Sequence, residues 1–313
     1  MAKWSIIDLG TNTFNLLVVE IDEKRNRKNL YQEKIPVRLG EGGINAGIIQ
    51  DEPFRRGLKA MEQFAKKNKE LQTDTIFAFA TSAIRSSTNG KLFTKTVKEI
   101  CGIEIQIIDG DTEAELIFEG VRLSGILGPH TSLILDIGGG SCEFILCNQE
   151  GIFWKKSYDL GVARLFERFR HQNPISLSEI KALESLFTIS LTHLFEALKS
   201  YPTTELIGSS GSFDSFAEMI SFKIFGEDRV SNLPAYTFSI PEYQQIHQQL
   251  LHSTLEERFQ IPGLVAMRAD MIVIASILVN YLIQQISINS MKVSAYALKE
   301  GMMEKCITSN LNH

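Results

Sequence analysis

The chain has 313 residues, of which 44% are hydrophobic and 22% charged, a balance typical of globular proteins and unlike collagen, coiled coils or disordered chains. Its 32 lysines and arginines stand against 37 aspartates and glutamates, which gives a net charge of −5. Broad electrostatic attachment to nucleic acid is therefore not favoured, and an anionic ligand needs a local site. The length indicates two domains or one large domain.

The first third of the chain alternates predicted strands and helices. Apolar, β-rich runs at 4–8 and 14–21 surround a glycine-containing turn and predict a hairpin. A helix is expected from Asp51, because apolar residues then recur at helical spacing. The pattern next predicts strand 75–79, helix 93–100, strand 103–108 and helix 113–123. This alternation indicates an α/β domain.

A second series of elements begins after residue 123. Residues 132–136 and 142–147 are predicted strands around a glycine-rich turn. Ser176 and Glu179 predict a capping box that starts a long helix ending near residue 200. The sequence then predicts strand 205–207, helices over much of 213–288, strand 291–294 and a last helix at 298–307.

Several patterns limit the class of protein. The four cysteines form no C-x-x-C pair and the histidines no H-E-x-x-H cluster, which predicts neither a disulfide framework nor a zinc site. The longest apolar segment, 271–288, contains serine, asparagine and glutamine, which favours a buried helix over a membrane span. The N-terminus has no secretory hydrophobic region. We therefore expect a cytoplasmic enzyme or binding protein that contacts neither membrane nor nucleic acid.

Two segments 128 residues apart repeat one another, DLGTNTFNLLV at 8–18 and DIGGGSCEFIL at 136–146. The matched pairs are Asp8 with Asp136, Gly10 with Gly138, and Thr13 with Ser141. One such loop is weak evidence, since the pattern is common at strand ends. Two copies, each after an apolar strand, indicate a duplicated domain whose hairpins face each other across a cleft.

Both loops contain residue types that hold phosphate. Glycine lets the backbone approach a ligand closely, and successive N–H groups in such a turn form a nest for an anion. Thr13 and Ser141 would add hydroxyl donors. Asp8 and Asp136 stand where a carboxylate could hold hydrated Mg²⁺. The alternative is a pair of ordinary hairpins in which each aspartate caps its own turn.

The two loops resemble the phosphate loops of the actin, sugar kinase and heat-shock ATPase superfamily. The surrounding sequence narrows the resemblance to the exopolyphosphatase/guanosine pentaphosphate phosphohydrolase family. The matching segments are DLGTNTFNLLVVEID at 8–22, VRLGEGG at 37–43, FATSAIRSSTNG at 79–90, IIDGDTEAELIFEGV at 107–121, LILDIGGGSCEFIL at 133–146, YDLGVARLFERF at 158–169, GSSGSFDSFAEM at 208–219 and, more loosely, VSAYALKEGM at 293–302. They cover nearly the whole chain in family order.

The resemblance implies two duplicated, actin-like (ribonuclease H-like) α/β domains with the active site in the cleft between them. Domain I is expected to comprise 1–123 and the C-terminal helix 298–313, and domain II 124–297. The implied activity removes a terminal phosphate from inorganic polyphosphate, or from the 5′ end of guanosine pentaphosphate, with water as acceptor and Mg²⁺ or another divalent cation as cofactor. The resemblance also implies a homodimer.

Two residues carry the implied chemistry. Glu113 matches the second glutamate of the family's G-x-E-E-A-R motif, which makes it the catalytic base; the alternative is a first-turn glutamate favoured by the helix dipole. Arg85 matches an arginine that contacts phosphate, for which a planar guanidinium is well suited; the alternative is a surface arginine after a strand. The chain departs from the motif at Thr112, in place of glutamate, and at Glu115, in place of arginine.

The resemblance assigns three further groups of residues. The phosphate cradle comprises Asn12, Thr13, Gly138, Gly139, Gly140 and Ser141. The carboxylates around the metal and the attacking water are Asp136, Glu143 and Asp8. The loop with Gly208, Ser210, Gly211 and Ser212 matches the loop near the nucleotide base in the superfamily. For Glu143 the alternative is an outward-facing strand residue, and for the last loop it is simple closure of the cleft.

Two other functions remain open. One is an ATP-dependent phosphotransferase of the same superfamily that acts on a small acceptor. The other is a non-catalytic sensor of polyphosphate or of alarmone nucleotides. The departures at Thr112 and Glu115, and Cys142 where the family usually has threonine, motivate the sensor hypothesis.

Overall fold

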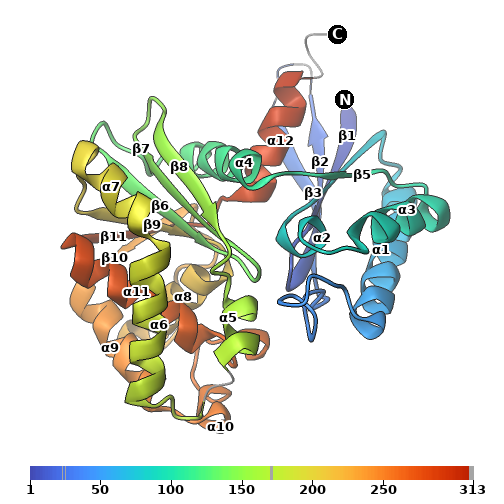
Figure 1. The fold of residues 1–313 in the computed structure, drawn as a ribbon. Helices are drawn as coiled ribbons and strands as arrows, with labels where there is room; N and C mark the ends of the chain where they lie inside the picture. The colour runs from blue at the N-terminus through green and yellow to red at the C-terminus, as the bar shows by residue number, and fades with distance from the viewer. Residues whose placement is uncertain (23, 25, 170–171, 310–313) are drawn as a thin grey trace.

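The computed structural model describes residues 1–22, 24, 26–169 and 172–309, which form two sheets with surrounding helices (Figure 1). The expected C-terminal helix 298–313 is α12 (Leu298–Ser309), and residues 310–313 lie outside the described residues. Among the residues described, no helix combines the length and the apolarity needed to cross a bilayer.

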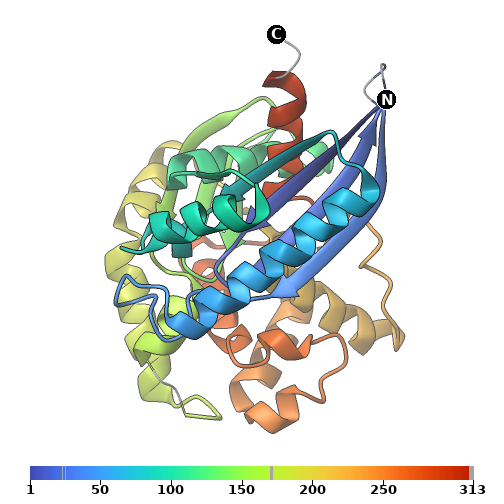
Figure 2. The same ribbon diagram turned by 90° about the vertical axis from the view of Figure 1, so that its right-hand side faces the viewer.

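The first sheet has five strands in the order β3-β2-β1-β4-β5. Its antiparallel part is β1 (Ala2–Leu9), β2 (Thr13–Ile21) and β3 (Arg27–Pro36). Its parallel part adds β4 (Thr75–Ala80) and β5 (Ile105–Ile107) beside β1. One face is covered by α1 (Asp51–Leu71) and α3 (Gly90–Cys101), and Figure 2 shows α1 lying along it. The short α2 (Ser82–Arg85) follows β4.

The second sheet has six strands in the order β10-β11-β9-β6-β7-β8. These are β6 (Ser132–Ile137), β7 (Cys142–Cys147), β8 (Ile152–Tyr158), β9 (Glu205–Ser209), β10 (Ala235–Phe238) and β11 (Ser290–Ser294). The helices that accompany it are α5 (Val162–Phe169), α6 (Leu177–Ser190), α7 (Thr192–Ser200), α8 (Gly211–Phe225), α9 (Ile240–His252), α10 (Leu255–Arg258) and α11 (Ile272–Ile286), with a 3₁₀ turn at Ala266–Arg268.

The two sheets share one topology. In each, three consecutive antiparallel strands are joined to parallel strands on the side of the first, as β3-β2-β1-β4-β5 and as β8-β7-β6-β9-β11; β10 adds an antiparallel edge to the second. This is the arrangement of actin-like, ribonuclease H-like domains. The predicted duplication and fold class are confirmed.

Two helices lie between the sheets and join them. α4 (Gly110–Leu123) and α12 pack against each other, and one apolar core contains residues of both (Figure 1). That core includes Ile6 and Leu17 of the first sheet as well as Ile134 and Ile145 of the second. The domains are therefore connected by continuous apolar packing as well as by the chain.

Most predicted elements are present, including α1 from Asp51, the buried helix α11 and the capping box of Ser176 and Glu179. The helix predicted to run to residue 200 is instead two helices, α6 and α7, which meet at Leu191. The sequence analysis also missed β3, β8, β10 and α5. β3 (RKNLYQEKIP) is an edge strand with no fully buried residue, so its composition lacks the apolar run that marks a strand.

The α4–α12 crossing depends on two glycines, which gives a test of its contribution to stability. A Cβ at Gly120 would overlap the carbonyl oxygen of Ala297, and one at Gly301 would overlap that of Leu116. We expect Gly120→Ala to lower the free energy of unfolding by about 1–3 kcal/mol, despite the better helix propensity of alanine, because overpacking forces the helices apart. Urea denaturation measures this.

Gly128→Ala is the matched control, since a Cβ there meets nothing within 4 Å. Equal stability of the Gly120→Ala and Gly128→Ala variants would show that the crossing tolerates a side chain and does not hold the domains together.

Candidate active site

The two repeated segments form equivalent turns. In the β1–β2 turn the Gly10 N–H donates to the Thr13 carbonyl at 3.1 Å, and in the β6–β7 turn the Gly138 N–H donates to the Ser141 carbonyl at 3.0 Å. The strand register is equivalent too, since Asp8 lies opposite Asn15 and Asp136 lies opposite Glu143. Asn15 and Glu143 therefore occupy the same place in the two halves.

At these paired positions, polar side chains of neighbouring strands form hydrogen bonds with one another. Asn15 Nδ2 donates to Asp8 Oδ2 at 2.9 Å in the first sheet. In the second, Ser209 Oγ donates to Asp136 Oδ2 at 2.6 Å and Ser157 Oγ donates to Glu143 Oε1 at 2.7 Å. Directly opposed residues share a face of the sheet, so each row gathers its polar groups on one side.

The glycines of the second turn allow the two domains to touch. A Cβ on Gly139 would lie 2.8 Å from Asn12 Nδ2 and 2.9 Å from Thr11 Cβ, closer than real side chains come. A Cβ on Gly140 would overlap Ser82 Oγ. These glycines thus serve the contact between the turns in addition to any approach of phosphate to the backbone.

A cavity of about 220 Å³ lies between the turns. The predicted site residues that line it are Asp8, Asn12, Thr13, Glu113, Asp136, Gly138, Gly139, Gly140, Ser141, Ser210, Gly211 and Ser212. Three others lie behind its wall. Glu143 is 1% exposed, Arg85 is joined to Glu113, and Gly208 lies within β9 against the ring of Phe213.

Glu113 lies in the first turn of α4, next to Arg85. Asp109 is the N-cap of the helix, and its Oδ1 accepts the Thr112 N–H at 2.7 Å. Glu113 is buried, with 6% of its surface exposed. Arg85 Nη1 donates to Glu113 Oε2 at 2.8 Å and to the Ile108 carbonyl at 3.0 Å. The contact between arginine and glutamate is therefore made within the protein, and it orients the carboxyl group toward the cavity wall.

Burial controls the protonation of the acidic groups. It raises the pKa of Glu113 to about 7, although the adjacent Arg85 guanidinium acts in the opposite direction. Burial likewise raises the pKa of Asp8 and of Asp136 to about 6 each. Burial, and then the nearby Glu113, raise the pKa of Glu143 well above its usual range. A carboxyl group that titrates near neutral pH suits general-base catalysis.

The acidic residues fit the way Mg²⁺ is usually held at phosphate sites. Asp8 Oδ1 is buried and has no hydrogen-bond partner among the described residues, and it borders the cavity. Within the described ranges no three His, Cys, Asp or Glu side chains are grouped to hold a metal. Mg²⁺ typically binds one or two carboxylates together with water and substrate phosphate, so Asp8 and Asp136 are a sufficient protein contribution.

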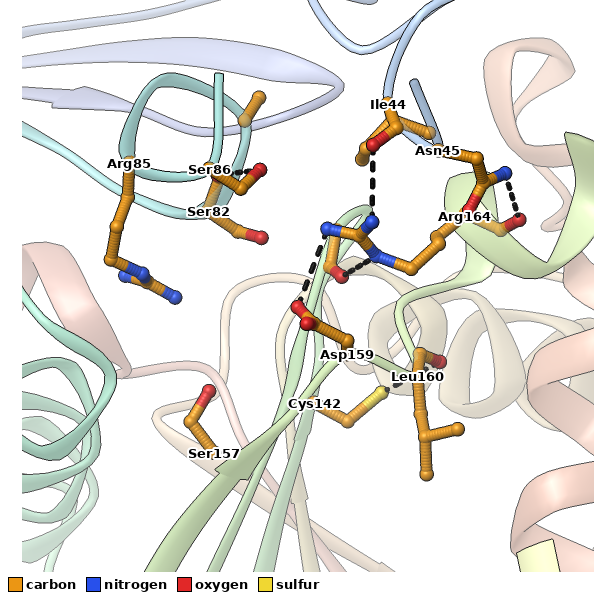
Figure 3. Close-up of polar contacts among 12 residues, drawn as sticks. Ile44, Asn45, Ser82, Arg85, Ser86, Cys142, Ser157, Asp159, Leu160 and Arg164 are labelled. Carbon is orange, nitrogen blue, oxygen red and sulfur yellow. Dashed lines mark hydrogen bonds and ion pairs between the residues drawn. The ribbon is translucent and has the colours of Figure 1, made fainter. Parts of the chain in front are cut away.

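The three departures from the family motif are accommodated locally. Thr112 supplies the N–H that caps α4, and Glu115 forms an ion pair with Lys155 of β8 at 3.0 Å. Cys142 is buried, and its Sγ donates to the Leu160 carbonyl at 3.3 Å, as a hydroxyl could (Figure 3). None of these three residues lines the cavity.

The loop after β9 supports the second turn through its hydroxyl groups. Ser209 bonds to Asp136, and Ser210 Oγ donates to the Ile137 carbonyl at 2.9 Å. Ser210, the residue before α8, has φ 72°, an unusual value for a residue other than glycine. Ser210, Gly211 and Ser212 border the cavity, so the loop is placed both to hold the turn and to meet a ligand.

Sequence reasoning missed the cations of the cavity, Lys34, Arg268 and Lys299. Lys34 is on the unpredicted strand β3, and Arg268 lies in the 3₁₀ turn before α11. Lys299 falls within the loosely matching tail VSAYALKEGM, which was the available signal. Isolated basic residues with no common spacing give no motif, and the fold alone brings them together.

Arg164 of α5 bridges the domains on one side of the cleft (Figure 3). Its Nε donates to the Gly140 carbonyl at 3.0 Å, and its Nη1 donates to the Ile44 carbonyl of the first domain at 3.1 Å. Asn45 Nδ2 returns a bond to the Arg164 carbonyl at 3.0 Å, and Asp159 Oδ1 lies 3.3 Å from Nη2. These contacts connect Ile44 and Asn45 of the first domain to the β6–β7 turn of the second.

The fold and the site together define a two-domain α/β protein with a polar cavity between two equivalent turns, one from each domain. The model of the Ppx/GppA phosphatase family matches residues 17–309, so the chain belongs to this family. The resemblance stated from the motifs is confirmed.

Two solved structures are similar to this chain over nearly its whole length. An exopolyphosphatase from Cytophaga hutchinsonii ATCC 33406 is 36% identical, with 98% of each chain covered and a TM-score of 0.94. A Ppx/GppA enzyme from Aquifex aeolicus is 20% identical, with 96% of this chain and 98% of that chain covered and a TM-score of 0.78, and shares the fold.

The Arg164 bridge can be tested by hydrogen exchange. In Arg164→Met the bonds to Gly140 and Ile44 are lost, so we expect amides of residues 38–48 to exchange about 10-fold faster, as local opening becomes easier. Mass spectrometry of peptides measures the rate. Arg168→Met, at an exposed position of the same helix, is the control, and equal exchange in both variants would mean that the bridge does not hold the segment.

The raised pKa of Glu113 predicts a pH dependence of stability. The unfolded chain ionises this group near 4.5 and the folded chain near 7, so rising pH across this interval favours the unfolded state. Glu113→Gln removes the effect. The free energy of unfolding of the variant, relative to wild type, should therefore increase by about 1–3 kcal/mol between pH 4.5 and 8.

Chemical denaturation at several pH values measures this difference. Glu115→Gln, which removes an exposed glutamate of the same helix, is the control. A Glu113→Gln difference that stays constant with pH would contradict the raised pKa.

Proposed function

We propose that the protein is an exopolyphosphatase that releases the terminal phosphate of inorganic polyphosphate, with water as acceptor and Mg²⁺ as cofactor. The observation that carries the proposal is the buried Glu113 carboxyl, which Arg85 holds at 2.8 Å at the wall of a cavity between two equivalent glycine-containing turns. Burial raises the pKa of this group to about 7. The similarity to the Cytophaga hutchinsonii exopolyphosphatase over 98% of both chains supports the substrate class.

The reaction needs a proton acceptor near the attacking water. At neutral pH a substantial fraction of Glu113 is ionised, and its carboxylate accepts the proton as the water oxygen bonds to the terminal phosphorus. The bond from that phosphorus to the bridging oxygen breaks, which yields phosphate and a chain shorter by one unit. Arg85 fixes the Glu113 carboxyl through its 2.8 Å bond and so acts as a positioning residue.

Binding of the phosphate falls to the turns. The backbone N–H groups of the two turns, with the Thr13 and Ser141 hydroxyls, provide donors for phosphate oxygens. Asp8 and Asp136 would hold Mg²⁺, which supplies positive charge against the phosphate oxygens when bound. The contact between the turns and the Arg164 bridge hold the two domains together beside the cavity.

Guanosine pentaphosphate is the second candidate substrate, because it presents the same terminal phosphoanhydride to the same cradle. The phosphotransferase and the sensor remain the competing functions. Thr112, Glu115 and Cys142 do not line the cavity, which supports an enzyme over the sensor. The homodimer implied by the family resemblance stays a prediction, which light scattering of the purified protein tests.

The first experiment is phosphate release from long-chain polyphosphate, tripolyphosphate, guanosine pentaphosphate and ATP in parallel, with Mg²⁺ and with EDTA. We expect release from polyphosphate, its loss in EDTA, and a decrease in kcat of about 10²–10⁴-fold in Glu113→Gln, the usual contribution of a general base. Glu115→Gln, exposed on the same helix, should keep wild-type turnover.

The other outcomes identify the alternatives. Release only from guanosine pentaphosphate would reassign the substrate, and turnover of ATP only with an added acceptor would indicate a phosphotransferase. Near-normal turnover by Glu113→Gln would overturn the base assignment, and tight binding without release from any substrate would indicate a sensor.

A further inference from the structure

Lys34 occupies a defined position on the cavity wall, at the end of the polar row in the first sheet. It lies opposite Asn15, and Asn15 lies opposite Asp8, so the three residues face the same side of the sheet. All three line the cavity. The lysine is on the edge strand β3, two strands from Asp8, which corresponds to roughly 10 Å at the usual strand spacing.

The charge of Lys34 is not used by the protein itself. Its side chain is exposed, and it forms no ion pair with any residue that the structure describes. The other cations of the wall are engaged, since Lys299 Nζ lies 2.7 Å from Glu300 Oε1 and Arg268 Nη1 donates to Ser215 Oγ at 2.8 Å. Among the residues described, Lys34 is thus an unpaired amino group at the wall of the cavity, and desolvation by the surrounding protein, followed by the nearby Arg268, lowers its pKa from the usual value for lysine.

Asp8 lies at the other end of this row, on β1, and lines the same cavity as Glu113. The position equivalent to Lys34 in the second sheet is Ser157, which is bonded to Glu143. At this position the first sheet has Lys34, which is unpaired among the described residues, and the second sheet has the neutral hydroxyl of Ser157, bonded to Glu143.

We infer that Lys34 binds phosphates of the substrate chain that do not react. This rests on the proposed function. A chain whose terminal phosphate lies at Glu113 would pass Asp8 and reach Lys34 only after several further units, because roughly 10 Å exceeds a single phosphoanhydride link. The ligand class is a linear polyanion with several consecutive phosphates. A compact ammonium on a flexible stem suits such a repeating chain, since it requires no fixed bidentate geometry.

The test is the kinetics of Lys34→Gln with long-chain polyphosphate and with tripolyphosphate. We expect KM for the long chain to rise about 10-fold, the effect of losing one charge-assisted hydrogen bond, with kcat within about 2-fold of wild type. KM for tripolyphosphate should change by less than about 3-fold. Lys34→Arg should restore most of the affinity, which a merely structural role of the lysine does not predict.

Lys28→Gln is the matched control, because Lys28 is an exposed lysine of the same strand that does not line the cavity. Equal KM values for Lys34→Gln and wild type on the long chain would overturn the inference. So would an equal increase for tripolyphosphate, which would place Lys34 at the reacting end. A larger increase for guanosine pentaphosphate than for the long chain would overturn it too, and would indicate a nucleotide site.

A binding measurement separates this inference from the proposed function. Calorimetric titration of long-chain polyphosphate into Glu113→Gln, with and without Lys34→Gln, needs no turnover. If wild type releases no phosphate from any substrate, the proposed function fails. The inference then still stands if the second substitution weakens long-chain binding about 10-fold, and it falls if binding is unchanged.

Discussion

The carboxyl groups of Asp8, Glu113 and Asp136 line one cavity, Glu143 is buried behind its wall, and the rest of the site compensates for their burial. Desolvation raises the pKa of each group above its usual range. An anionic substrate would be repelled by a fully ionised set. In the proposed function, partial protonation, the donors of the two turns and the wall cations would offset this repulsion of a polyanion, and a bound divalent cation would add further positive charge.

The parts of the site that could be predicted from sequence are those with local signatures. The repeated segments that begin at Asp8 and Asp136 predict both turns, because a strand, a glycine turn and a second strand follow one another within a dozen residues. The interior strands could also be predicted, since their residues are almost continuously apolar. Glu113 was identified only by the family motif, because a first-turn glutamate has no distinctive local pattern.

The parts that could not be predicted depend on long-range placement. β3 is polar because it is an edge strand, so its pattern gave no strand signal and Lys34 was overlooked with it. The break at Leu191 leaves helical residues on both sides, and no proline or glycine marks it. Arg164 connects segments about 120 positions apart, which only the assembled domains bring into contact.

The equivalence of Asn15 and Glu143 has a consequence for the direction in which the cleft works. Two identical halves related by a two-fold axis would form a cleft without front or back, in which a symmetric chain could bind in either sense. Here one half presents an amide beside a free lysine, and the other presents a carboxyl group beside a hydroxyl. The two halves differ at these equivalent positions, and this difference gives the cleft a polarity.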